Sequence, residues 1–422
     1  MLMRFRAGHR PAHAGSEQQS LGRAGRLGLV AVILTLALSL AMEPQPRPLP
    51  PDPVQQTYTI DLPIVLGGYQ PSTPAYTIYV PIMLNGHQPF IATQSSFGYG
   101  WNIFQYQSFQ AESGYPQYPP TSFNWLRLTD NPPSQSLCGV NRLPYKVLLR
   151  LNKADAASTP QQVADDTWTW AHNMESAPGQ NKCVEAFEIG NEPNLSGQGQ
   201  YNGPVNPAIY ADQLCAAYDA IKRTDPSFIV VSAGLAPTGG AADQHLAMES
   251  MAFMRAMLNE IQVNRLSHGD PGGCFDVFGY HNYGFRTGYQ TSPADVANCP
   301  AEMCFRGVED VWKTLQQYGV SKPIWSTETG WMIDDGTGQC SSSPWTPIFA
   351  GFALPPATQA SQLVGAFQYA RANWPWLGAM FVFNLDFNPP RRSSNPCYDE
   401  QGWFAVQGRP AEAALEAMPK LP

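Results

Sequence analysis

Two glutamates in this sequence stand where short runs of strand-forming residues end. Glu192 belongs to the segment FEIGNEPN, and Glu328 belongs to the segment PIWSTETGW. Glu328 follows Glu192 by 136 positions, or about 45 residues for each of three strand–helix units if three lie between them. In barrels built from such units, the active site gathers at the carboxyl ends of the strands. The spacing therefore predicts that both carboxyl groups lie at one mouth of a barrel.

Two carboxyl groups that face each other across a barrel mouth suit the cleavage of a glycosidic bond. The leaving oxygen needs a proton, while the anomeric carbon needs a nucleophile or an activated water molecule. One carboxyl must therefore stay protonated, and a neighbouring negative charge or an apolar wall raises its pKa. Taken singly, a glutamate at a strand end is more often a helix cap or an ion-pair partner, so the hypothesis depends on the pair.

The remaining sequence predicts the barrel that this pair requires. Short β-branched or aromatic runs alternate with amphipathic stretches from Ala92 to Pro422, as in α/β proteins with a parallel sheet and helical crossovers. Eight runs are predicted strands, the number that closes a (β/α)8 barrel. They are Gly98–Ile103, Asn124–Leu128, Lys146–Leu151, Ala186–Gly190, Ile229–Ala233, Val277–His281, Pro323–Thr327 and Ala379–Leu385.

The predicted crossovers include helices over Ala208–Thr224, Met248–Ile261 and Ala357–Asn373, where apolar residues recur at three- and four-residue spacing. The first half of the barrel is compressed. Only seventeen residues separate Leu128 from Lys146, too few for a full crossover helix. Either this unit is irregular or the second strand is misplaced.

Together the two motifs resemble those of the clan-A retaining glycoside hydrolases, which are TIM-barrel glycosidases with an acid/base after strand four and a nucleophile after strand seven. The resemblance covers most of Phe97–Pro422. It implies that Glu192 is the acid/base, Asn191 the ligand of the sugar 2-hydroxyl, and Glu328 the nucleophile. It also implies hydrolysis with retention of configuration and no metal or organic cofactor, since two carboxyl groups suffice.

Three further residues match supporting positions of this family. His281 and Tyr283 resemble its H-x-Y motif, whose tyrosine hydrogen-bonds the nucleophile, although a buried core pair is a competing interpretation. Arg127 resembles the strand-two arginine that holds the nucleophile ionised. An ion pair at the bottom of the barrel would explain Arg127 equally well.

The predicted eighth strand departs from the family, because it lacks the tryptophan that many members place under the sugar. Trp331 and Trp345 follow the seventh strand and are expected to contact the substrate in its place. Phe285 and Trp101 are the alternatives.

The first 90 residues predict export and a spacer. Five arginines precede the apolar run Leu27–Met42, which as a helix would be about 24 Å long, short of a roughly 30 Å hydrocarbon core. Residues 1–42 are therefore expected to be a signal peptide, and a retained membrane anchor is the alternative. Residues 43–90 are Pro-rich, and the segments Tyr58–Pro71 and Tyr76–Pro89 share nine of fourteen positions. This repeat is either an extended spacer or a tag for surface attachment.

Eight cysteines suit an exported protein, because export permits disulfides. The preferred pairs are Cys299–Cys304 and Cys340–Cys397; Cys138 and Cys183 could pair as well, and Cys215 and Cys274 are left unassigned. The sequence contains neither a C-x-x-C pair nor an H-E-x-x-H motif, so zinc binding has little support. After residue 42 the chain carries 20 basic and 32 acidic side chains, which argues against a nucleic-acid partner.

The sequence thus predicts an extracellular or cell-surface glycosidase whose (β/α)8 domain covers residues 91–422 and whose partner is a carbohydrate. N-terminal attachment to a membrane or cell surface is an option, and nothing indicates the oligomeric state. Two other functions fit the same motifs. One is a catalytically silent carbohydrate-binding surface protein, and the other is a transglycosylase, which transfers the sugar to a second sugar. The loops that select the sugar and linkage carry no readable signal.

Overall fold

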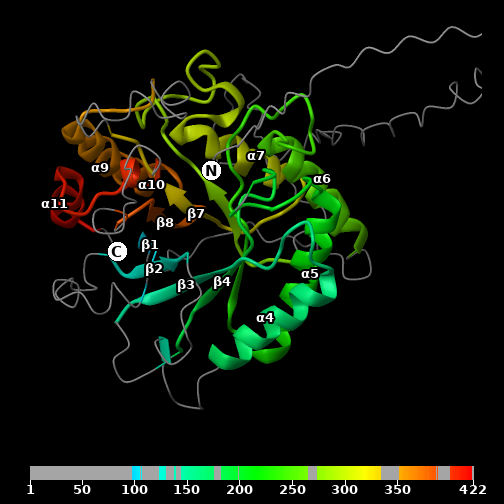
Figure 1. Cartoon of the computed structure of the whole chain (residues 1–422). Coiled ribbons are helices and arrows are strands. Elements are labelled where there is room, and N and C mark those ends of the chain that lie inside the picture. The colour runs from blue at the N-terminus through cyan, green and yellow to red at the C-terminus, as the bar shows by residue number, and fades with distance from the viewer. Residues whose placement is uncertain are drawn as a thin grey trace, which may run out of the picture. The chain divides into compact units, whose positions relative to one another are not determined.

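The computed structural model describes residues 97–104, 106, 123–129, 137–138, 144–174, 182–197, 199–264, 273–333, 351–385, 387 and 400–420 (Figure 1). These residues belong to one compact unit. The predicted signal or anchor over 1–42 and the Pro-rich segment 43–90 lie outside the described residues. The same is true of Trp345 and of the predicted disulfide between Cys340 and Cys397.

Within the described residues, eight parallel strands form a single sheet. Hydrogen bonds join them in the order β5-β4-β3-β2-β1-β8-β7-β6. The strands at the two ends of this order, β5 and β6, are linked by the bridges Val231–Val277 and Leu235–Tyr280, so the sheet curls into a nearly closed barrel (Figure 1). The strands are β1 Gly98–Ile103, β2 Trp125–Leu128, β3 Lys146–Leu151, β4 Ala186–Ile189, β5 Ile229–Ser232, β6 Phe278–His281, β7 Ile324–Thr329 and β8 Leu377–Val382.

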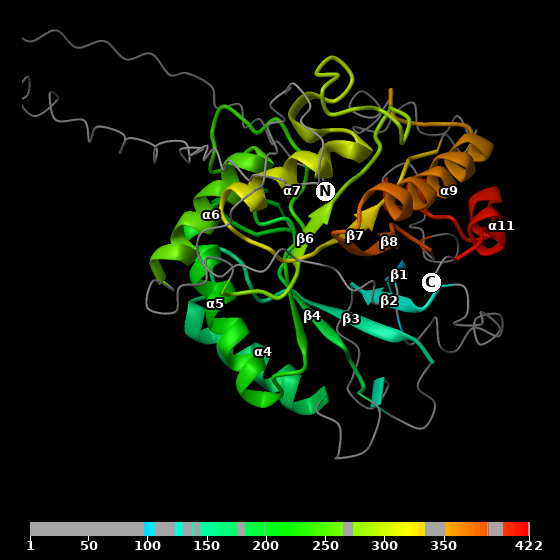
Figure 2. The ribbon, with the colours of Figure 1, turned by 180° about the vertical axis from the view of Figure 1, so that it is seen from behind.

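Helices cover the outside of the barrel, which makes the fold a (β/α)8 TIM barrel. Figures 1 and 2 show α4, α5 and α6 along one side, and α9 with α11 along another. Among the described residues, no helix combines the length and the apolar character needed to cross a membrane. The helices are α4 Pro160–Met174, α5 Pro207–Thr224, α6 Ser250–Asn264, α7 Val308–Gln317, α9 Pro356–Asn373, α10 Glu400–Phe404 and α11 Pro410–Ala417, with the short 3-10 turns η2 Pro300–Glu302 and η3 Phe305–Gly307.

The ends of α5 illustrate how the local sequence sets these boundaries. The Asn206 side chain accepts hydrogen bonds from the backbone N–H groups of Ala208 and Ile209, and Pro207 opens the first turn. The helix ends before Pro226, because proline disfavours helical geometry in the residue that precedes it.

Each predicted strand coincides with an observed one, and the differences lie at the ends. The seventh strand extends to Thr329, so Glu328 lies inside β7 rather than after it. The eighth strand spans Leu377–Val382, two to three residues earlier than predicted. The second strand was placed correctly. In the short connection from β2 to β3, the only described residues in a helical conformation are Leu137 and Cys138.

The barrel interior is apolar at one level and polar at the next. The apolar level consists of eight packed side chains: Trp125, Leu148, Ala186, Val231, Val277, Trp325, Ala379 and Phe381. Alternate residues of a strand face the same side, so the residues two positions further along also point inward. On β2, β3, β4 and β7 these are Arg127, Arg150, Glu188 and Thr327. A second, larger apolar cluster fills the space between the strands and the helices.

Three disulfides lie within the described part of the chain. Cys299–Cys304 was a preferred pair, and Cys138–Cys183 was considered; the structure contains both. The third joins Cys215 of α5 to Cys274 before β6, two cysteines that sequence reasoning left unassigned. These bonds tie the chain before β4 and the helix α5 to distant segments.

Closure of the barrel between β5 and β6 requires a residue without a side chain at Gly279. A Cβ atom there would lie 2.2 Å from the backbone oxygen of Ser232, which cannot rotate away. We therefore expect Gly279→Ala to lower the free energy of unfolding by about 1–3 kcal/mol or more, as overpacking does. Urea denaturation measures the change. The control Gly239→Ala, where a Cβ meets nothing within 4 Å, should be nearly neutral; equal stability of both variants would contradict this account of closure.

Candidate active site

Glu192 reaches the mouth of the barrel through a tight turn after β4. Gly190 has a φ of 87° and Glu192 a φ of 43°, both in the left-handed region, and such strain in a non-glycine residue clusters at functional sites. The backbone N–H of Glu192 donates to the carbonyl oxygen of Gly234, 3.1 Å away, at the end of the neighbouring strand. The turn thereby fixes the direction of the glutamate side chain.

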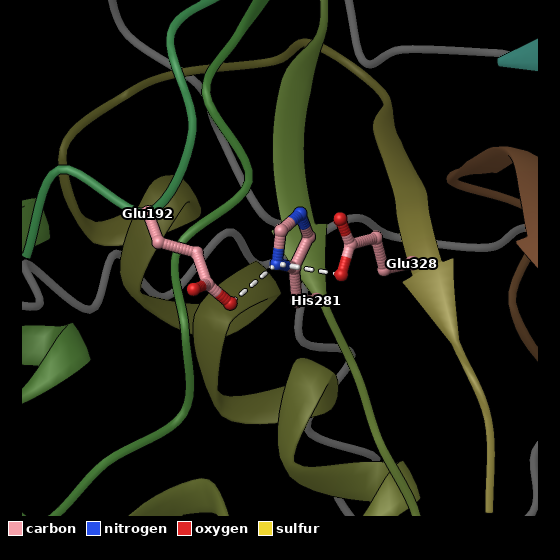
Figure 3. Close-up of side chains that lie close together, drawn as sticks. All are labelled: Glu192, His281 and Glu328. Carbon is pink, nitrogen blue, oxygen red and sulfur yellow. Dashed lines mark hydrogen bonds and ion pairs between the residues drawn. The ribbon is translucent and has the colours of Figure 1, made fainter. Parts of the chain in front are cut away.

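Glu192 and Glu328 face each other across the imidazole ring of His281 (Figure 3). The Nδ1 atom of His281 lies 2.9 Å from Oε1 of Glu192 and 3.5 Å from Oε2 of Glu328. One oxygen of each carboxylate and one ring nitrogen all lie within 4.8 Å of one another. Glu192 is 1% exposed and Glu328 is 4% exposed, so water hardly screens the two charges from each other.

Two donors hold Glu328. The Nη1 atom of Arg127 donates to Oε1 at 2.8 Å, and the hydroxyl of Tyr283 donates to Oε2. Burial acts to raise the pKa of Glu328, but His281, Arg127 and the hydrogen bond from Tyr283 outweigh it, and the pKa lies below its ordinary value. Glu328 is therefore suited to remain a carboxylate.

Arg127 is the centre of the polar layer inside the barrel and is fully buried. Its Nε atom donates to Oε2 of Glu188 at 2.5 Å, and Nη1 also donates to Oδ1 of Asn102 at 2.7 Å. Its Nη2 atom contacts Oδ1 of Asn191 at 3.4 Å. Burial alone would lower the pKa of Arg127, but the charges of Glu188 and Glu328 raise it above its ordinary value, so the guanidinium keeps its charge.

Glu192 has a different set of partners. Its Oε2 atom accepts a hydrogen bond from the Nε2 amide of Gln200 at 2.8 Å, and its Oε1 atom lies beside His281. Burial acts to raise the pKa of Glu192, but the hydrogen bond and charge of His281 and the hydrogen bond from Gln200 act to lower it, and the net pKa lies below its ordinary value. The permanent charge of Arg127 is bound to Glu328 and not to Glu192. The two carboxyl groups are therefore chemically unequal.

A metal ion is a poor fit between these groups, although Glu192, His281 and Glu328 offer ligand atoms close together. Both oxygens of Glu328 already accept hydrogen bonds, from Arg127 and Tyr283. A guanidinium 2.8 Å from one oxygen would also repel a cation. These contacts disfavour a metal ion between the carboxylates.

The structure brings most of the predicted site residues together. Asn191, Arg127, His281 and Tyr283 all contact one another or a motif glutamate. Arg127 lies on the side of the apolar layer that holds Glu328, and not at the bottom of the barrel. Trp345 lies outside the described residues.

The expectation that Trp331 contacts the substrate is corrected. Its side chain is 0% exposed, and its indole N–H donates to the carbonyl oxygen of Thr287 at 2.8 Å. A Cβ atom on Gly284 would lie 1.8 Å from its ring, which shows how tightly the indole is packed. Trp101, one of the alternatives, is likewise buried and stacks on Phe123. These tryptophans are core residues.

Several residues of the site were missed by sequence reasoning. Glu188 and Asn102 hold Arg127, and Gln200 holds Glu192. Glu188 had a readable signal, because it is a charged residue two positions after Ala186 in a strand buried on both sides. Gln200 had none, because only the folded loop after β4 brings its amide to the carboxylate.

An aromatic cluster beside Tyr283 was missed as well. The rings of Phe383 and Phe404 lie 5.9 Å and 5.1 Å from that of Tyr283. Phe104 lies 5.8 Å from Phe383, and all three phenylalanines are partly exposed. Phe383 follows β8, where the tryptophan of the resembling family was absent from the sequence.

No protein-family model and no curated protein match the chain. Solved structures that resemble it are glycoside hydrolases. A GH2 β-galacturonidase from Eisenbergiella tayi is 13% identical with a TM-score of 0.47, over 78% of this chain and 52% of that chain, so this chain spans about half of its length. A glucosidase from Croceicoccus marinus is 13% identical with a TM-score of 0.49, over 78% and 68% of the two chains. A family 5 mannosidase from Rhizomucor miehei is 14% identical with a TM-score of 0.46, over 77% and 92%.

Removal of Arg127 should leave two buried carboxylates without a cation. We expect Arg127→Met to lower the free energy of unfolding by about 3–5 kcal/mol at pH 7, as the loss of one partner of a buried ion pair does. The loss should shrink at pH 5, because without Arg127 burial raises the pKa of Glu328, which can then take up a proton. Urea denaturation at both pH values measures this.

The matched control is Arg306→Met, which removes a partly exposed ion pair with Glu309 and should cost less than about 1 kcal/mol. If both variants lost the same stability at pH 7, Arg127 would not be the counterion that its contacts indicate.

Proposed function

We propose that this protein is a retaining glycoside hydrolase that cleaves an oligo- or polysaccharide by double displacement. The observation that carries the proposal is the approach of one oxygen of Glu192 to one oxygen of Glu328 within 4.8 Å. Retaining enzymes hold their carboxyl groups about 5–5.5 Å apart, whereas inverting enzymes need about 6.5–9.5 Å to admit a water molecule. The close pair therefore supports retention.

In the first step, the Glu328 carboxylate attacks the anomeric carbon and forms a glycosyl ester. The bond from that carbon to the leaving oxygen breaks, and Glu192 gives its proton to this oxygen. In the second step, Glu192 takes a proton from water, whose oxygen bonds to the anomeric carbon as the ester bond breaks. Glu328 is thereby restored as a carboxylate, and Glu192 is again protonated.

The unequal environments of the two glutamates support this division of roles. Arg127 and Tyr283 stabilise a negative charge on Glu328, the nucleophile. The partners of Glu192 include His281 and the neutral amide of Gln200, whereas the guanidinium of Arg127 is bound to Glu328, so we assign to Glu192 the proton that passes to the leaving oxygen. The side chain of Asn191 accepts a contact from Arg127 and donates to the backbone oxygen of Gly199. We assign to it the hydrogen bond with the 2-hydroxyl group of the sugar.

The partly exposed rings of Phe383, Phe404 and Phe104 form the apolar wall of the same site. Phe383 and Phe404 lie beside Tyr283, the hydrogen-bond partner of the nucleophile, and Phe104 contacts Phe383, so we assign to Phe383 the platform under the sugar. Export remains part of the proposal. The disulfides in the described part of the chain are compatible with an extracellular protein.

Replacement of either glutamate by glutamine tests the assignment. Glu328→Gln should lose at least about 10³-fold in kcat, because no carboxylate remains to attack, and Glu192→Gln should lose about 10²–10⁴-fold, as removal of general acid–base catalysis does. Turnover of a panel of aryl glycosides and soluble polysaccharides measures both. With a dinitrophenyl glycoside, whose leaving group needs no proton, Glu192→Gln should show a burst followed by slow release.

Circular dichroism would verify that both variants keep the barrel. Near-wild-type turnover in either variant would refute its assigned role. Sugar binding without any bond cleavage by the wild type would instead identify a silent binding protein.

Tyr283 should control the acidic limb of the pH profile. Its hydroxyl stabilises the ionised form of Glu328, so Tyr283→Phe raises the pKa of that carboxyl and moves the acidic limb of kcat/KM to higher pH. A hydrogen bond to a charged group is worth about 1.5–3 kcal/mol, which corresponds to a shift of about one unit or more. Tyr218→Phe, on the outer helix α5, is the control. An unmoved acidic limb would show that Tyr283 does not tune the nucleophile.

A further inference from the structure

A hollow of about 330 Å³ lies on the outside of the barrel, between α7 and α9. Arg306, Glu309, Trp312 and Lys313 come from η3 and α7, and the other lining residues come from the end of α9 and the chain leading into β8. Figure 2 shows α7 and α9 in the outer helical layer. None of its lining residues belongs to the set that surrounds Glu192 and Glu328.

Three tryptophans form a stack in this hollow. The ring of Trp312 lies 5.1 Å from that of Trp376 at an interplanar angle of 8°, and Trp376 lies 5.4 Å from Trp374 at 22°. Trp374 and Trp376 are buried, whereas Trp312 is partly exposed. The stack therefore presents one partly exposed indole, that of Trp312, in the hollow.

The polar groups of the hollow are already fixed in place. Glu309 accepts hydrogen bonds at Oε1 from Nε of Arg306 at 2.7 Å and from the indole N–H of Trp374 at 3.1 Å. The guanidinium of Arg306 lies 5.0 Å from the ring centre of Tyr369. Its Nη1 and Nη2 atoms also donate, to the carbonyl oxygen of Gln290 at 3.2 Å and to Oε2 of Glu309 at 3.1 Å, so Arg306 is held in one orientation with one N–H left on each of these two nitrogens.

The charges of the hollow favour a neutral ligand. Arg306 is paired with Glu309, and Lys313 with Asp310, each at 2.7 Å, so neither cation is left for an anion. A cationic ligand would meet these two side chains, and the face of Tyr369 is already taken by Arg306. A sugar ring fits, because its C–H faces stack on an indole while its hydroxyl groups bond to the rim.

We propose that this hollow is a second, non-catalytic saccharide site that binds a segment of a neutral polysaccharide on Trp312. The site rests on the proposed function for its substrate class, because the chain bound here is the one cleaved at Glu328. Binding outside the barrel tethers the polymer to the enzyme and raises its local concentration around the protein.

The test is native electrophoresis through gels that contain cereal β-glucan, xylan or galactomannan. The Glu328→Gln background prevents hydrolysis during the run. The protein should be retarded in at least one gel, and adding Trp312→Ala should weaken its apparent affinity about tenfold, since a stacking contact of about 1.4 kcal/mol corresponds to that factor. Trp168→Ala is the matched control, because Trp168 is 47% exposed on α4 and lines no part of the hollow.

A second variant guards against a folding defect. Asn373 is exposed at the end of α9, and Asn373→Arg should block the hollow while leaving every ring in place. Trp312→Ala in the otherwise wild-type protein should raise KM for the polymer and leave turnover of aryl glycosides unchanged. Equal retardation of the parent and both variants, or no retardation of the parent in all three gels, would overturn the proposal. Neither result affects the proposed function, which depends on bond cleavage alone.

Discussion

The ion pairs of Arg127 are the constraint on which the rest of the site depends. A guanidinium with no exposed surface is tolerable only when carboxylates surround it, and Glu188 and Glu328 supply two at 2.5 Å and 2.8 Å. The same contacts fix the orientation of Glu328 and oppose its protonation. Glu188 accepts a further bond from the backbone N–H of Gly234, so the network also ties β2, β4 and β7 to the end of β5.

The barrel makes this network possible because it alternates small and large residues toward its axis. Gly98 and Gly100 of β1 leave room for the rings of Trp125 and Phe381, which seal the apolar level below the polar one. Gly234 leaves room for the imidazole of His281, since a Cβ there would lie 2.2 Å from Nε2. The apolar level excludes water from below, and the low dielectric strengthens every interaction among the carboxylates above it.

Much of this arrangement was predictable from local patterns. The eight strands were found because each is a short run rich in β-branched or aromatic residues, and the motif glutamates lie at strand ends where parallel barrels collect their chemistry. The prediction was wrong where it depended on exposure. Trp331 follows β7, but its ring packs against Gly284 in the core, and the partly exposed rings near Tyr283 are those of Phe383 and Phe404, with Phe104 against Phe383.

The sequence by itself determined the number and order of the strands, the position of both glutamates along them, and the identity of Arg127, His281 and Tyr283 as candidate partners. Only the tertiary structure decided which donor meets which carboxylate, that Gln200 joins them, and that Cys215 pairs with Cys274. The physical reason is that strand periodicity is a local property of a few residues, whereas the contacts among side chains from five different strands exist only after the barrel closes.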